Sequence, residues 1–214
     1  MAVYCFRSDE PGKKSSVNIW RADADGANLK QLSHGSADVG GNCSPDGRWV
    51  YFTDAKNARV MRVPMEGGEA EVVPGSTMPG LAVGIPGIGL SPDGKWLSFV
   101  PLKGGQGAAV KIAVVNLVTG SAADTRMLEP DDRIVTLPRI TPDSKSVVYI
   151  IREKGADNLW FQPLDGSRSR QITNFPSDSI AYFEFSPDGK SLGVLRSHVE
   201  SDVVLLRDTG ATAH

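Results

Sequence analysis

Residue types that carry much of catalytic and metal chemistry are scarce in this sequence. Its 214 residues include three histidines and two cysteines. Zinc sites need several such side chains at short, characteristic spacings, and His34, His198, Cys5 and Cys43 show no such spacing. A Ser–His–acid triad also needs a histidine, and the third one, His214, is the last residue. We therefore expect no catalytic residues, no metal site, no cofactor and no enzymatic activity in the chain itself.

Long apolar runs and an excess of basic residues are also missing. No stretch approaches the roughly 18 apolar residues of a membrane-spanning helix. The first ten residues have neither the basic start nor the apolar core of an export signal. The net charge is −2, whereas a nucleic-acid-binding domain normally has a basic surface. We expect no membrane insertion and no nucleic-acid partner, and the sequence as written would stay in the compartment where it is made.

Two cysteines are too few for a disulfide framework. Two alternatives remain open for Cys5 and Cys43. Both can be buried thiols, which is common for free cysteines, or they can form one disulfide if neighbouring strands bring their Cα atoms within about 7 Å.

What the sequence does contain is a repeated tetrapeptide of the type Ser-Pro-Asp-Gly. Its copies are Ser44–Gly47, Ser91–Gly94, Thr141–Ser144 and Ser186–Gly189. Proline presets the second position of a type I turn, aspartate suits the third because it can bind the local backbone, and glycine relieves the exit. A short run rich in β-branched and aromatic residues follows each copy. These runs are Trp49–Phe52, Trp96–Val100, Val147–Ile151 and Leu192–Leu195, and Ala2–Phe6 reads as a fifth copy without its turn.

A second peptide pattern follows these runs. Asn18-Ile19-Trp20 leads to Asp25-Gly26, and Asn158-Leu159-Trp160 leads to Asp165-Gly166. The two copies lie 140 residues apart, which is three repeat lengths. Asp-Gly between extended segments is typical of a tight hairpin. Weaker copies of the extended segment are Val60–Val63, Ile112–Val115 and Val203–Leu206.

Each repeat therefore contains up to four antiparallel strands, which we call A to D from the inside outwards. Four strands in about 45 residues is the period of a β-propeller blade. We predict an all-β chain, a β-propeller of five four-stranded repeats in one domain, with strand A missing from the first repeat and strand D from the last. The repeats cover approximately residues 1–35, 36–76, 77–130, 131–175 and 176–214.

These motifs resemble the TolB-type, or WD-like, propeller repeats with a Pro-Asp signature. The stretch Asp157–His198 is most similar to propellers attached to bacterial serine/threonine kinases. The resemblance implies a protein- or peptide-binding module, a sensor or scaffold part of a bacterial signalling or envelope system. The alternative it implies is a propeller that gates substrate for a prolyl-oligopeptidase-like or lyase enzyme whose catalytic part is absent. The resemblance also suggests a periplasmic or other extracytoplasmic location, against the cytoplasmic location that the missing export signal indicates.

Function on a repeated scaffold usually lies in the loops that vary. The loops from strand D to the next strand A vary here and lead into the innermost strands, so we predict that they ring the mouth of a central channel. An acidic ring would favour a basic peptide or a cation. An ordinary solvated loop face is the alternative. The predicted binding residues are Asp38, Asp131, Asp132, Arg133, Asp178 and Ser179.

Incomplete first and last repeats would leave strand edges and apolar faces uncovered. We therefore predict a homodimer that joins the open end blades of two copies. The rival is a monomeric five-bladed ring with a thin seam between its first and last blades.

Overall fold

The computed structural model describes residues 2–8, 15–77, 81–103, 111–130, 134–135, 138–186 and 188–198. These residues form antiparallel strands, with one short 3-10 turn at Ala122–Asp124. The strands are β1 (Ala2–Ser8), β2 (Ser16–Ala22), β3 (Lys30–Gln31), β4 (Asp38–Cys43), β5 (Trp49–Asp54), β6 (Arg59–Pro64), β7 (Glu71–Val72), β8 (Leu81–Leu90), β9 (Trp96–Lys103), β10 (Ile112–Asn116), β11 (Arg126–Leu128), β12 (Arg139–Ile140), β13 (Ser146–Glu153), β14 (Ala156–Pro163), β15 (Arg170–Gln171), β16 (Ser179–Phe185) and β17 (Leu192–Ser197).

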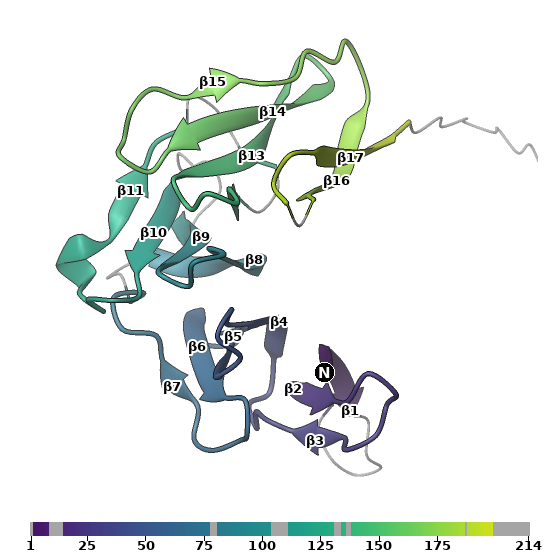
Figure 1. Cartoon of the computed structure of the whole chain (residues 1–214), viewed down its shortest axis with the longest axis vertical. Coiled ribbons are helices and arrows are strands. Elements are labelled where there is room, and N and C mark those ends of the chain that lie inside the picture. Colours follow the sequence, from purple (N-terminus) through teal and green to yellow (C-terminus); the bar gives the residue numbers. More distant parts are fainter. Residues whose placement is uncertain are drawn as a thin grey trace, which may run out of the picture.

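The strands make five sheets in which chain neighbours pair with one another. Their orders are β1-β2-β3, β4-β5-β6-β7, β8-β9-β10-β11, β12-β13-β14-β15 and β16-β17. The sheets follow one another around an open arc, with β1–β3 at one end and β16–β17 at the other (Figure 1). This confirms the predicted all-β propeller with a first repeat that lacks strand A. The predicted third strand of the last repeat, Val203–Leu206, lies outside the described residues.

Each Ser-Pro-Asp-Gly turn closes on itself through side-chain bonds. The Ser44 hydroxyl donates to Asp46 Oδ1 at 2.5 Å and accepts from the Trp49 amide at 2.9 Å. The Arg48 amide also donates to Asp46 Oδ1, and these hydrogen bonds hold the pKa of Asp46 below its ordinary value. The turns at Ser91, Thr141 and Ser186 repeat this bonding. The prediction that these aspartates bind the local backbone is confirmed.

The sheets pack face to face, and alternate residues of a strand serve the two neighbours. On β5, Val50 and Phe52 are buried with Ile19 of the first sheet. Tyr51, which lies between them in sequence, is buried with Leu97 of the third sheet. We call the face that points to the next sheet along the chain the leading face and the opposite one the trailing face. Four such apolar clusters hold the five sheets together, as expected of stacked repeats that cannot bury their faces alone.

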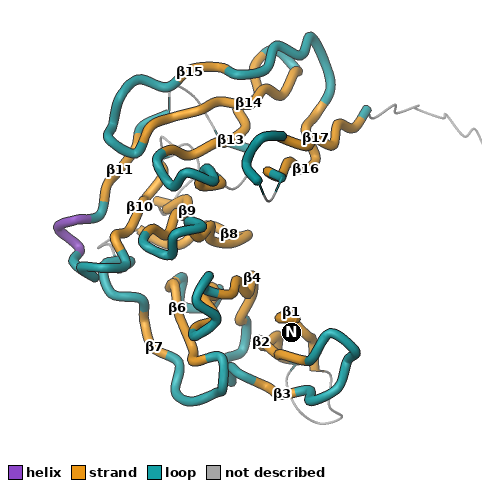
Figure 2. Tube along the Cα trace, viewed as in Figure 1, coloured by secondary structure: helices purple, strands orange, loops and turns teal. Residues whose placement is uncertain are grey.

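The inner strands and the connecting turns define the two ends of a channel along the middle of the arc. Figure 2 shows the loops gathered at the ends of the strands and the 3-10 turn on the outer side, between β10 and β11. Each A strand starts at the loop from the preceding sheet and ends at a Ser-Pro-Asp-Gly-type turn. One end of the channel therefore carries the varied loops and the other end carries the repeated turns.

Candidate functional site

A hollow lies among the inner strands, next to the repeated turns. It is a cavity of about 390 Å³, within the range of roughly 300–1,000 Å³ usual for ligand pockets. Its walls come from the ends of β4, β8, β12 and β16 and from the turn prolines Pro45, Pro92 and Pro142. We call it the channel cavity. It lies at the turn end of the arc, opposite the loop end where the sequence predicts a binding site.

One wall of the channel cavity carries a polar network between the fourth and fifth sheets. Arg139 of β12 forms an ion pair with Glu184 of β16, with 3.0 Å between Nη1 and Oε2. The Tyr182 hydroxyl donates to the same oxygen at 2.8 Å, and the Arg139 guanidinium lies 5.0 Å from the Tyr182 ring centre. The hydrogen bond to Glu184 raises the pKa of Tyr182. Arg139 and Glu184, which line the cavity, are partly exposed, so they can contact a ligand as well as each other.

The wall formed by β4 carries no Asp, Glu, Lys or Arg side chain. It presents the Asn42 amide and the Cys43 thiol. Cys43 is a free thiol with an exposed side chain, so neither of the two alternatives in the sequence, a buried thiol or a disulfide, describes it. Partial burial raises the pKa of this thiol, which keeps it in the protonated form. Cys5 pairs with Ile19 through the backbone of β1 and β2.

Asp38, predicted at the channel mouth, is instead turned into the protein. Its side chain is 2% exposed. The Gly35 amide donates to its Oδ2 at 2.9 Å, and Asn18 Nδ2 approaches the same oxygen at 3.4 Å. The carboxylate thus fastens the loop that leads into β4, because Gly35 has no Cβ that would collide with it. The expectation that Asp38 contributes an acidic group to the loop surface is therefore wrong.

Asp178 and Ser179 lie at the loop end as predicted, within a cluster of charged side chains. Asp178 binds Arg196 at 2.9 Å and His198 Nδ1 at 2.7 Å. The His198 contact is the main cause that lowers the pKa of Asp178. The Ser179 hydroxyl accepts from Arg152 at 3.0 Å. The guanidinium groups of Arg196 and Arg152 bring positive charge next to the acidic group here, so the described part of this end is mixed rather than acidic.

The other predicted loop residues, Asp131, Asp132 and Arg133, lie outside the described residues. Their predicted role in binding stays a prediction. The polar wall of the channel cavity was missed because inner strands lack the repeated motifs of the B and C strands. The signal available in the sequence was a charged residue inside an otherwise apolar A strand, as in Arg139-Ile140 and Glu184-Phe185.

One sequence pattern resembles a catalytic motif, and the structure shows what it forms. Residues 189–193, Gly-Lys-Ser-Leu-Gly, match the Gly-x-Ser-x-Gly pattern of a serine-hydrolase nucleophile elbow. Such an elbow joins a strand to a helix, whereas Ser191 stands between a repeated turn and β17. His198 follows the far end of β17, about 20 Å away at the rise of a strand. Ser191 is therefore the backbone donor to Ser186, not a nucleophile paired with this histidine.

The described residues also bear on metal binding and membrane insertion. No group of three or more histidine, cysteine, aspartate or glutamate side chains there is arranged to hold a metal ion. No helix in that part of the chain is long and apolar enough to cross a membrane.

Comparison with known proteins identifies the architecture. No family model and no curated protein sequence matches the chain. Among solved structures, TolB from Acinetobacter baumannii aligns over 98% of this chain and 47% of its own length, with a TM-score of 0.68 and 21% identity. An oligogalacturonate lyase from Vibrio parahaemolyticus aligns over 90% of this chain and 55% of its own, with a TM-score of 0.71 and 17% identity.

A third neighbour, dipeptidyl peptidase 4 from Porphyromonas gingivalis, aligns over 91% of this chain and 34% of its own, with a TM-score of 0.60 and 12% identity. The chain thus spans about half of the first two structures and a third of the last. At these identities the likeness concerns the fold. The chain has the β-propeller fold of TolB-like proteins, an architecture that TolB, a lyase and a peptidase share.

Proposed function

We propose that this chain is a non-catalytic protein- or peptide-binding propeller module, a sensor or scaffold part of a bacterial signalling or envelope system. The observation that supports the proposal most is the channel cavity with Arg139 and Glu184 on one wall. A guanidinium suits a carboxylate, a carboxylate suits an amine, and the neighbouring prolines offer apolar contact. A peptide segment presents groups of all three kinds.

The chemistry of the cavity wall also favours binding over turnover. Nucleophilic catalysis needs an activated nucleophile beside a base. In the described part of the cavity the candidate nucleophile is Cys43, whose pKa is raised and not lowered. The acid Glu184 is occupied by Arg139 and Tyr182. We expect no turnover of peptide, ester or oligosaccharide substrates in a broad screen. Activity that survives repurification and disappears on changing His198 would overturn this.

The binding proposal is tested with peptides selected from a random phage-displayed library against the immobilised chain. Selected peptides are then titrated by fluorescence anisotropy. We expect Arg139→Ala and Glu184→Ala each to weaken binding about tenfold or more. Arg62→Ala is the matched control, because Arg62 pairs with Glu71 at 2.6 Å on the outer strands of the second sheet.

The outcome also separates the two ends of the channel. Binding that is unchanged in both cavity variants but lost in Asp178→Ala would place the site on the loop end that the sequence predicts. Failure to enrich any peptide would contradict a peptide-binding module.

A second candidate function is a propeller that gates substrate for a catalytic domain. The fold likeness to an oligogalacturonate lyase and a dipeptidyl peptidase favours it. The two proposals differ in whether the chain binds peptides in the absence of a catalytic domain. A gating module has no affinity of its own for selected peptides, whereas a binding module retains it.

A further inference from the structure

The inner strands β4, β8, β12 and β16 each place one residue at the same level of the channel cavity, two positions before the repeated turn. These residues have equivalent partners on the neighbouring B strands, and all of them line the cavity. In chain order they are Asn42, Gly89, Arg139 and Glu184. The turns beside them repeat almost unchanged, whereas this level presents an amide, no side chain, a guanidinium and a carboxylate. It therefore carries the polar groups that are particular to this chain.

The hydroxyl groups of the cavity wall are already used within the turns. Ser91 donates to the aspartate of its own turn at 2.6 Å and accepts from the Trp96 amide at 2.9 Å. Ser186 makes the same two contacts in its turn. The thiol of Cys43 is a weak donor. The lining side chains that remain to bind a polar group of a ligand are those of Asn42, Arg139 and Glu184.

Arg139 has more hydrogen-bonding groups to offer than Glu184. A guanidinium has five N–H donors, and the ion pair of Arg139 with Glu184 engages one nitrogen, Nη1, at 3.0 Å from Oε2. The same oxygen accepts from the Tyr182 hydroxyl, so this carboxylate already has two partners. The Arg139 side chain is 38% exposed. The wall thus has a surplus of donors, which suits a ligand group that accepts hydrogen bonds.

The third sheet leaves space on the other flank of Arg139. Gly89 stands there, and a Cβ on this residue would lie 2.9 Å from the Pro138 carbonyl oxygen and 4.0 Å from Arg139 Cα. The close approach of β8 to β12 therefore requires a glycine, and position 89 puts no side chain beside the guanidinium. Glu184 flanks Arg139 on the side of the fifth sheet, so an anionic group can approach from the side of Gly89.

We propose that Arg139 binds a carboxylate of the ligand and that Glu184 is the positioning residue that holds the guanidinium. This inference rests on the proposed binding function and names the group that the cavity recognises. The planar fork of a guanidinium can serve two carboxylates, one through Nη1 and the other through its remaining N–H groups. The C-terminus of a peptide and an acidic side chain both present this group.

NMR titrations of the full chain with small probes test the proposal without a selected peptide. N-acetylalanine carries a terminal carboxylate, and N-acetylglutamic acid α-amide carries a side-chain carboxylate. N-acetylalaninamide is neutral, and alaninamide carries an amine. We expect saturable shifts of the Arg139 Nε–H signal with a carboxylate probe and none with the other two, and the tighter carboxylate probe identifies the source. Shifts with the amine probe alone, or with none of the probes, would overturn the proposal.

Two substitutions at Glu184 and one at Arg139 test the roles of the pair. Arg139→Ala should raise the dissociation constant of the bound carboxylate probe about tenfold or more, as should Glu184→Ala, which releases the guanidinium. Glu184→Gln should restore wild-type or higher affinity, because glutamine keeps an acceptor for Arg139 and removes a negative charge beside the ligand. A Glu184→Gln variant as weak as Glu184→Ala would overturn the proposal, since an amine ligand would need that charge.

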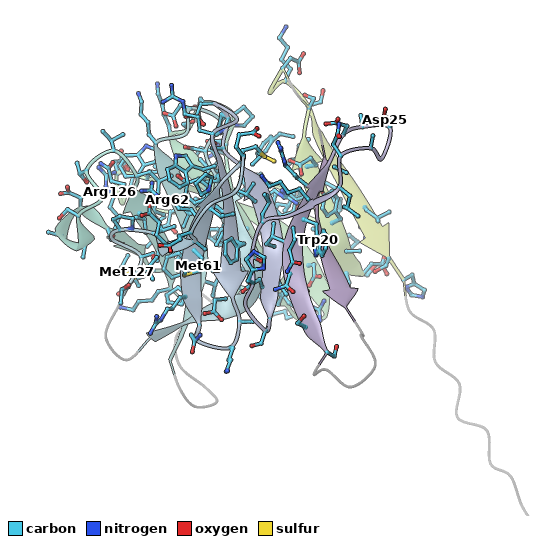
Figure 3. The ribbon with its side chains drawn as sticks, turned by 90° about the horizontal axis from the view of Figure 1, so that it is seen from below. Trp20, Asp25, Met61, Arg62, Arg126 and Met127 are labelled. Atoms are coloured by element: carbon cyan, nitrogen blue, oxygen red, sulfur yellow. The ribbon has the colours of Figure 1, made fainter. Side chains whose placement is uncertain are left out.

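Arg62→Ala is the matched control for these variants. Arg62 makes the same two kinds of contact as Arg139, an ion pair with Glu71 at 2.6 Å and a cation–π contact at 4.3 Å from the Trp49 ring centre. It stands on β6 of the second sheet, away from the cavity lining (Figure 3). Its affinity for the carboxylate probe should equal that of the wild type, and the amide spectrum of each variant shows whether the fold is kept.

The probes also separate this inference from the proposed function. Peptides that are enriched and bind, while no carboxylate probe shifts the Arg139 signal, would reject the carboxylate site and leave the binding module. A carboxylate probe that binds at Arg139, while no peptide is enriched, would support the site and reject peptide binding.

Discussion

Arg152 donates two hydrogen bonds to the buried carboxylate of Asp157, from Nε to Oδ1 at 2.6 Å and from Nη2 to Oδ2 at 2.9 Å. Asp157 is 1% exposed and stands on β14, while the Ile180 amide of β16 donates to its Oδ2 at 2.9 Å. Arg152 also reaches Ser179 on β16. One carboxylate therefore joins the fourth sheet to the fifth at the loop end of the channel.

We predict that Asp157→Ala destabilises the fold by about 1–3 kcal/mol, because the Ile180 amide and the Arg152 guanidinium lose their acceptor. Urea unfolding followed by tryptophan fluorescence measures the change. Glu153→Ala is the control, since Glu153 is exposed and the ion pair it forms among the described residues is with its neighbour Lys154, at 3.7 Å. Its change should stay within about 0.5 kcal/mol. Equal losses in the two variants would show that Asp157 has no special role.

The same carboxylate makes stability depend on pH. Burial alone would raise the pKa of Asp157, but hydrogen bonds from Arg152 and Ile180 outweigh it and hold the pKa below 3.8. Because the pKa is lower in the folded than in the unfolded chain, the ionised group stabilises the fold above the ordinary value, and this contribution is lost as the pH falls through the folded value. We expect the stability gap between wild type and Asp157→Asn to be full at neutral pH and to shrink below about pH 4. A gap independent of pH would contradict this.

Ser144 occupies a backbone conformation that the other turns give to glycine. Its φ is +57°, and Gly47, Gly94 and Gly189 have φ values of +71°, +70° and +69°. We predict that Ser144→Gly stabilises the chain by about 0.5–1 kcal/mol, after the loss of a long hydrogen bond from the Asp93 amide at 3.3 Å. Gly94→Ser is the converse and should destabilise it by about 1–2 kcal/mol. Thermal unfolding of both variants checks the opposite signs.

Alanine substitutions at two turn glycines with nearly the same φ distinguish the cost of backbone strain from the cost of a packing clash. A Cβ at Gly47 would meet nothing within 4 Å, whereas a Cβ at Gly189 would lie 2.8 Å from Pro142 Cβ of the preceding sheet's turn. Gly47→Ala should cost about 1–2 kcal/mol through its φ alone. Gly189→Ala should cost more, by the clash between sheets. Equal unfolding free energies would mean that the turns of neighbouring sheets can move apart freely.

The sequence predicted the strands that carry motifs, but not the side-chain contacts that join separate strands and loops. The run Val147–Ile151 falls inside β13, and Trp49–Phe52 falls inside β5, because turn chemistry and β-rich side chains are local signals. The position of Asp38 was misjudged because an acidic residue in a Gly- and Ser-rich segment reads as exposed, and only the backbone path shows the Gly35 amide that captures it. The Arg139–Glu184 pair joins equivalent positions of two successive A strands, each two residues before its turn and 45 residues apart in sequence, so no local pattern predicts the contact.

The bonds that close the Ser-Pro-Asp-Gly turns join residues no more than five positions apart. A repeat that is duplicated in the gene therefore brings with it all the residues that form its own turn. Asn18 and Asn158, which lie 140 residues apart, make the same loop contact. The side-chain amide of each donates to a backbone carbonyl 17 residues later, that of Gly35 or of Phe175. Tandem duplication can lengthen or shorten such a chain by whole blades, while mutation is free to alter the inner-strand residues that face the channel.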